Sequence, residues 1–155
     1  MKISLGVSLI IAGVAIVLAM AGGAWWWWKD NAEKLQEAGA AAFDEGRQAG
    51  AVLRESGCVD KAVERHRVAE NRTLLGSVRT NLFLRACLDT SKSEPAFCDG
   101  VPAKGEILST GLWAGQSCVK LGYTDSYCGQ MFTQISEYCS SPERASKLRL
   151  PAVKP

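Results

Sequence analysis

The sequence predicts an all-α protein in which an N-terminal transmembrane helix is followed by a small disulfide-stapled domain of about four helices. Three observations indicate this class. An uncharged apolar run lies at the start, six cysteines follow it, and the segments between glycine and proline breaks have helical periodicity. With 155 residues and one segment committed to the membrane, the chain has room for one small soluble domain.

The N-terminal run predicts a membrane anchor. From Ile3 to Trp28 there are 26 consecutive residues without a charge, more than the roughly 20 that a helix needs to cross a bilayer. Amphipathic indole rings close the run and suit the membrane interface; they belong to Trp25, Trp26, Trp27 and Trp28. We therefore expect residues 1–28 to form a signal-anchor helix in contact with the lipid bilayer.

Cleavage of the same segment is the alternative. Lys2 supplies a basic start, and Ala19-Met20-Ala21 forms an A-x-A pattern typical of a signal-peptidase site. Cleavage there would release a secreted disulfide-rich protein that begins near Gly22. The anchor is favoured because a tryptophan run just beyond a cleavage site would leave an exposed apolar patch in solution.

The cysteines predict disulfides. An even number of cysteines after an export segment is typical of a disulfide framework, and these are Cys58, Cys87, Cys98, Cys118, Cys128 and Cys139. Zinc sites usually use closely spaced pairs such as C-x-x-C, which are absent, so we expect no metal and no cofactor. Six cysteines allow 15 pairings, and the sequence leaves the pairing open.

Cysteine usage also predicts the location. Disulfides persist outside the cytoplasm, which places the C-terminal domain in an extracytoplasmic, periplasm-like compartment. The N-terminus is then cytoplasmic, and the chain is a single-pass protein of the cell (inner) membrane.

Residues 29–57 predict an Ala/Gly-rich helical stalk. Small or apolar side chains recur there at steps of three and four, the spacing of a helix-packing seam formed by Leu35, Gly39, Ala42, Gly46, Ala49 and Leu53. Small residues permit the close approach of a partner helix, which makes self-association through this seam a possibility to test. A flexible stalk is the alternative.

The cysteine-stapled domain is expected over residues 58–139. Gly57 suits the C-cap of the stalk helix, and Asp60 suits the N-cap of a second helix that runs to about Ala86. That helix carries six bases and three acids, a net charge of +3. A solvated face with local ion pairs is the favoured interpretation, and contact with headgroups or an acidic partner is the alternative. Residues 89–105 contain two prolines and two glycines and predict an irregular connection.

Two further helices complete the expected domain. The third spans Glu106 to Leu121 and stops at Gly122, and the fourth starts at an Asp125 N-cap and runs to about Tyr138. The tail over 140–155 holds three prolines and scattered bases, and we expect it to be loosely ordered.

No residue pattern predicts catalysis. His66, the only histidine, lies between two arginines and is expected on the surface. Metalloprotease, serine-hydrolase and phosphate-loop motifs are absent, so we expect no enzymatic activity. Eighteen bases against 16 acids give a net charge of +2, too weak and too dispersed to predict nucleic-acid binding.

Two functions fit these features. The first is a binding or accessory module that docks on a protein partner at the membrane surface through the seam or the basic second helix. The second is a lysis or envelope-bridging factor, because one N-terminal span followed by a helical extracytoplasmic region resembles the inner-membrane spanins of bacteriophages in topology.

Overall fold

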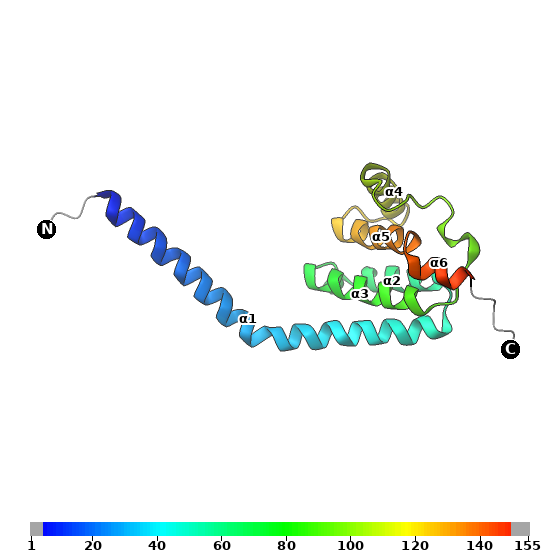
Figure 1. The fold of residues 1–155 in the computed structure, drawn as a ribbon, viewed down its shortest axis with the longest axis horizontal. Helices are drawn as coiled ribbons and strands as arrows, with labels where there is room; N and C mark the ends of the chain where they lie inside the picture. Colours follow the sequence, from blue (N-terminus) through cyan, green and yellow to red (C-terminus); the bar gives the residue numbers. More distant parts are fainter. Residues whose placement is uncertain (1–4, 150–155) are drawn as a thin grey trace. The chain divides into compact units, whose positions relative to one another are not determined.

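The computed structural model describes residues 5–149, with side chains from residue 12 onward except that of residue 30. Within these residues all regular elements are helices, which confirms the predicted all-α class. In chain order they are α1 (Leu5–Val52), α2 (Glu55–Arg67), η1 (Ala69–Asn71), α3 (Leu74–Thr90), η2 (Pro95–Cys98), α4 (Ile107–Lys120), α5 (Ser126–Cys139) and α6 (Pro142–Arg149) (Figure 1).

The chain divides into two compact units, Met1–Ala38 and Gly39–Pro155, and α1 contributes to both. Within the described residues, no helix has an apolar stretch long enough to cross a membrane. Residues 1–4 of the predicted 1–28 anchor lie outside the described part of the chain. The transmembrane helix therefore stays a prediction.

The predicted stalk over 29–57 differs from the structure in its end and in its role. α1 ends at Val52, and Gly57 lies in the first turn of α2 instead of capping the stalk helix. A short parallel pairing forms this junction: the Lys92 N–H donates to the Leu53 carbonyl at 3.0 Å, and the Glu55 N–H donates to the Lys92 carbonyl at 3.2 Å. From residue 39 on, α1 belongs to the second unit and packs there on α3.

Glycine permits the close packing of α1 on α3. A Cβ atom at Gly46 would lie within 3.0 Å of the Phe83 carbonyl group, and one at Gly50 would collide with the Cys87 carbonyl oxygen. Backbone atoms cannot move aside as a flexible side chain can, so these positions exclude larger residues. The neighbouring helix that the small-residue seam predicts is therefore α3 of the same chain.

The second predicted helix, Asp60 to about Ala86, is two helices in the structure. α2 ends at Arg67, and α3 begins after Thr73, whose side-chain hydroxyl accepts the Gly76 N–H at 3.2 Å. Gly76 is needed because a Cβ atom there would overlap the backbone of Asn71 in η1. No proline marks this break, and helical periodicity alone therefore predicted one continuous helix through it.

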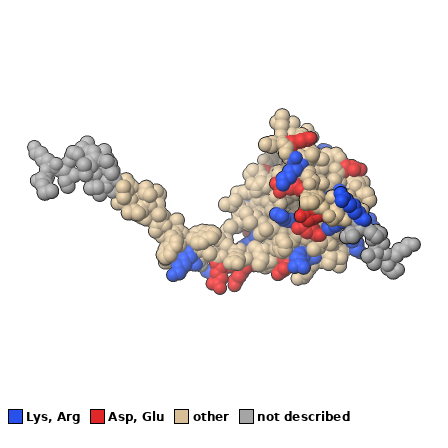
Figure 2. Space-filling model, viewed as in Figure 1, with Lys and Arg blue, Asp and Glu red and all other residues tan. Residues whose placement is uncertain are grey.

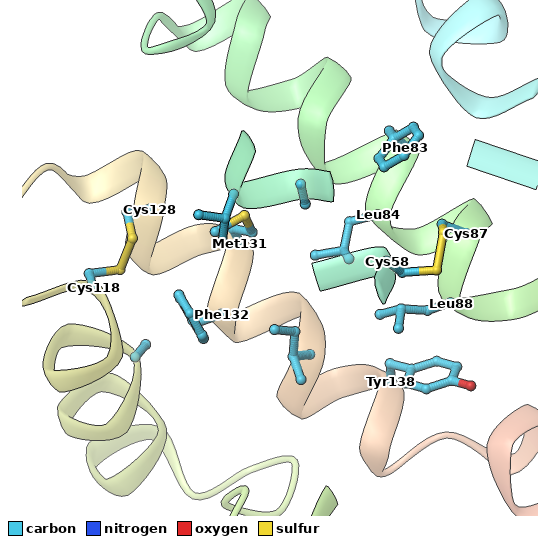
Figure 3. Packing of buried hydrophobic residues seen from close by; sticks show 14 residues of the cluster. Cys58, Phe83, Leu84, Cys87, Leu88, Cys118, Cys128, Met131, Phe132 and Tyr138 are labelled. Atoms are coloured by element: carbon cyan, nitrogen blue, oxygen red, sulfur yellow. A yellow bond between two sulfur atoms is a disulfide. The ribbon is translucent and has the colours of Figure 1, made fainter. Parts of the chain in front are cut away.

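The core lies among the helices of the second unit. α2 packs on α3, α3 on α5, and α5 on α4. Their buried side chains meet around two disulfides, with Phe83, Leu84, Leu88, Met131 and Phe132 among them (Figure 3). This sequence of contacts leaves α4 at one end of the series.

The last part of the domain confirms two expected helices and corrects the tail. α4 and α5 have nearly the predicted bounds, and the Asp125 side chain caps α5 by accepting the Cys128 N–H at 3.0 Å. The tail is helical over residues 142–149 as α6, where the buried Arg144 makes an ion pair, and residues 150–155 of the predicted tail lie outside the described part of the chain. In the sequence, Arg144 is a single charge in a proline-containing segment, and nothing near it indicates the distant partner Glu55.

Candidate functional site

All six cysteines pair, which confirms the predicted disulfides. Cys58–Cys87 joins α2 to α3, Cys98–Cys139 joins η2 to the end of α5, and Cys118–Cys128 joins α4 to α5. No cysteine is free for metal or redox chemistry. In the described part of the chain, no group of acids, cysteines or histidine could hold a metal ion either.

The structure places the predicted helix-packing seam largely inside the domain. Ala42 is buried, Ala49 and Leu53 pack against the core, and Gly39 lies close to the Leu82 side chain. Leu35 belongs to the first unit. Because α3 covers Gly46, that part of the seam is not open to a second chain, and an interaction surface must be sought elsewhere.

A buried ionic network surrounds Glu55, whose side chain is fully buried. Its carboxylate accepts hydrogen bonds from the Tyr138 hydroxyl at 2.7 Å, from Arg144 Nε at 3.0 Å and from the Glu94 N–H at 2.7 Å. Arg144 also donates to the Glu94 carbonyl at 3.0 Å. The network joins the start of α2 to α5, α6 and the segment before η2.

The chemistry of this network is structural. Burial, and then the hydrogen bond and charge of Glu55, raise the pKa of Tyr138, so the phenol stays protonated and donates. Burial lowers the pKa of Lys147, which donates to the Ser91 carbonyl at 3.1 Å and to the Leu88 carbonyl at the end of α3. Each buried charge has a partner inside the protein, and none is directed at an open cavity.

A surface hollow of about 390 Å³ lies beside Tyr138. Its lining carries both signs of charge, from Arg85, Lys104, Asp89 and Glu143. Burial raises the pKa of Asp89, while the nearby Arg85 opposes that shift. The mixed charges of the lining match no single class of ligand.

His66 is buried, with 2% of its surface exposed, so the prediction of a surface histidine is wrong. Its Nε2 atom lies 3.1 Å from Asp125 Oδ2, and its ring packs edge-on against Tyr123 at 4.7 Å. The flanking arginines predicted a surface position, but Cys58, Ala62 and His66 recur every four residues on the inward stripe of α2. That stripe was the available signal.

Asp125 links this histidine to the start of α5. Partial burial alone would raise the pKa of Asp125, but the hydrogen bonds from the Cys128 N–H and from His66 outweigh it and hold the pKa below its usual range. The Asp125 carboxylate therefore hydrogen-bonds both His66 of α2 and the first turn of α5. No serine or threonine side chain hydrogen-bonds the imidazole in the described residues, so the pair lacks a nucleophile to activate.

The outward side of α4 is an exposed apolar surface of the domain, and the start of α3 also exposes apolar side chains at Leu74, Leu75 and Val78. Thr110, Ala114 and Cys118 face the core, while four aliphatic side chains on the other side are 60–87% exposed. We call this surface the open face and define it as Ile107, Leu108, Gly111, Leu112, Gly115 and Val119. Neither glycine has any atom within 4 Å of the position that a Cβ would take.

The charged side chains of the domain are not gathered on one surface in the way that the apolar side chains of the open face are. Figure 2 shows acidic and basic side chains interspersed over the visible face of the domain. Between Ile107 and Val119 the chain carries no charged residue at all. The open face therefore differs from an ordinary solvated surface, because its exposed apolar side chains have no charged residue among them.

Comparison with protein-family models, curated proteins and solved structures finds no match to this chain. The functional argument therefore rests on the physical chemistry of its own residues.

Proposed function

We propose that the protein is a membrane-anchored, extracytoplasmic helical module that binds a partner at the membrane surface through the open face of α4. The observation that carries the proposal is this apolar face itself, because its four aliphatic side chains are 60–87% exposed and no charged residue interrupts it between Ile107 and Val119. A contiguous apolar patch on a soluble domain is typical of an interaction site.

The energetics of the open face favour binding. Ile107 and Leu108 are 87% and 78% exposed, and Leu112 and Val119 are 60% and 65% exposed. Full burial of one such side chain contributes about 1.5–3 kcal/mol. A partner that covers all four would gain several times that amount before the entropy of association is subtracted.

The anchor is supported by the sequence. The side chains of the uncharged run are described over residues 12–28, which are 17 in number, so a span of about 20 residues would also use part of residues 3–11. The four tryptophans at its end are 54–67% exposed in the structure. Exposed indole rings are favourably placed at a bilayer interface, whereas their exposure to water is unfavourable.

The three disulfides support an extracytoplasmic location. Each joins two elements of the small domain, and such bonds persist in oxidising compartments. With the domain outside, the N-terminus before the span is cytoplasmic.

The test is the intact mass of the full chain in membrane and soluble fractions, with and without reduction before thiol alkylation. We expect an uncleaved chain in the membrane fraction that gains six alkyl groups only after reduction. A soluble species that begins near Gly22 would replace the anchored module by a secreted one, and free thiols before reduction would contradict the oxidising location.

A second arm tests the open face. Leu108→Lys adds a charge to it, and Leu74→Lys adds the same charge at an exposed leucine of α3 that lies outside it. Leu108→Lys should reduce the yield of chemical cross-links between the domain and its partner in native membranes. Leu74→Lys should leave that yield unchanged. Equal behaviour of the two variants would remove the open face from the proposal.

A further inference from the structure

The open face has a shape that narrows the choice of partner. Its two glycines lie one helical turn apart and form a shallow hollow with Leu112, Gln116, Val119 and Lys120. Nothing in the described chain fills this hollow. A surface that is smooth, apolar and without deep pockets suits a fluid partner better than one that needs interlocking side chains.

Its area is too small for a stable pair of these domains. α4 has 14 residues, which at 1.5 Å per residue gives a length of about 21 Å, and a helix is about 10 Å wide. Two such faces would bury roughly 400–800 Å² in total, whereas specific protein interfaces bury about 1,200 Å² or more. A second copy of this chain is therefore a poor occupant.

Charge around the face favours anionic headgroups. Lys120 is the only charged residue that lines the hollow, and Lys104 lies just before α4. Glu106 at that end accepts a hydrogen bond from the Ser109 hydroxyl at 2.9 Å, and its negative charge offsets that of Lys104, so the attraction for an anion rests on Lys120. A lysine beside apolar side chains can reach a lipid phosphate while its stem stays in apolar surroundings.

We propose that the open face of α4 is a lipid-contact surface, on which Ile107, Leu108, Leu112 and Val119 enter the headgroup boundary and Lys120 contacts phosphate. The inference rests on the proposed anchor, because the anchor supplies the high local concentration of lipid that lets so small a face bind. The face then holds the domain against the bilayer and sets its orientation there.

Photocrosslinking of the full chain tests this contact. We would place p-benzoylphenylalanine at Leu112, and in a matched variant at Leu74, which has a similar exposure of 64% but lies on α3. Both chains are reconstituted in vesicles of equal parts phosphatidylcholine and phosphatidylglycerol, illuminated, and analysed by intact mass. We expect a chain-plus-lipid mass at Leu112 in clear excess over Leu74.

A second variant tests the lysine. Lys120→Gln in the Leu112 probe chain should lower the lipid adduct about fivefold in the anionic vesicles and have little effect in vesicles of phosphatidylcholine alone. Equal yields in the anionic vesicles would overturn the role of Lys120.

The outcomes separate this inference from the anchor. An adduct at twice the chain mass would overturn lipid contact in favour of a second copy, and an adduct to another protein in native membranes would overturn it in favour of a protein partner. A chain that stays with the vesicles but gives no excess adduct at Leu112 overturns the lipid contact while the anchor stands. A chain that does not stay with the vesicles overturns both.

Discussion

Two glycine pairs with identical spacing have opposite environments in this protein. Gly46 and Gly50 on α1 press against backbone atoms of α3, whereas Gly111 and Gly115 on α4 have nothing within 4 Å. Both pairs give a helix the same narrow surface, and both weaken its intrinsic stability by about 1 kcal/mol per glycine relative to alanine. Only the first pair has a visible structural reason, because its cost is offset by close packing inside the chain.

The contrast shows why a small-residue stripe in a sequence cannot be assigned a partner. The stripe on α1 predicts close helix approach, and its partner is α3 of the same chain. The stripe on α4 has no partner within the described chain, and its exposed aliphatic neighbours are the basis of the lipid contact that we propose. We call the packing of α1 on α3, together with the adjoining α1–α2 junction, the closed side of the domain, in contrast to the open face of α4.

The largest effect is expected at the ionic network that fixes the α1–α2 junction on the closed side. Arg144→Ala leaves the buried Glu55 carboxylate without its cationic partner and should lower the free energy of unfolding by about 3–5 kcal/mol. Lys61→Ala removes an exposed ion pair with Glu64, which solvent screens, and should change the free energy of unfolding far less. Denaturant unfolding of the disulfide-intact full chain in detergent measures both, and equal losses would contradict the buried network.

Gly46→Ala should cost about 1–3 kcal/mol, although alanine favours a helix. The added methyl group would meet the Phe83 carbonyl group, and α1 and α3 would have to separate. The same unfolding measurement applies. An unchanged or increased stability would mean that α1 does not pack on α3 as closely as the structure has it.

Asp125→Ala should cost about 1 kcal/mol at neutral pH, because it removes the N-cap of α5 and the hydrogen bond to His66. The lowered pKa of Asp125 gives the sign of the pH dependence. The charged carboxylate contributes its stability above the usual Asp pKa of about 3.9, and the contribution is lost as pH falls through the lower folded value.

Asp125→Asn provides the control for that pH dependence. Asparagine keeps the cap but cannot ionise. The stability difference between wild type and this variant should therefore shrink as the solution is acidified below about pH 4. A difference that stays constant down to pH 2 would show that the charge of Asp125 makes no contribution.

The smallest effect, with the opposite sign, is expected on the open face. Gly111→Ala should raise the free energy of unfolding by about 0.5–1 kcal/mol, because the helix gains propensity and the new methyl group meets no atom of the domain. Gly46→Ala is its matched control on the closed side. Destabilisation of both variants would remove the distinction between the two pairs.

Local signals in the sequence predicted the α4–α5 region well. Asp125 caps α5 as its position before an apolar stripe predicts, and Gly122 ends the α4 turn with a positive φ of 83°. These features depend on neighbours a few residues away. The sequence did not reveal the break between α2 and α3, because Thr73 and Gly76 are weak signals by themselves. The close contact of Gly76 with the backbone of Asn71, which explains the glycine, is visible only in the fold.

Burial of polar residues could not be predicted in the same way. Glu55 and Arg144 are 89 residues apart, and each looks like an ordinary surface charge in its own segment. His66 is similar, since its partner Asp125 lies 59 residues away. A buried charge is tolerated only when a partner reaches it, and that partner is set by the fold.

The sequence by itself determined that this protein is helical and cross-linked by its cysteines, and where α4 and α5 begin and end, because helical periodicity, caps and cysteine number are local or additive properties. The tertiary structure alone decided which cysteines pair, which glycine pair is closed, and that α4 keeps an apolar side exposed. These depend on which helix faces meet, and packing between distant segments selects those faces.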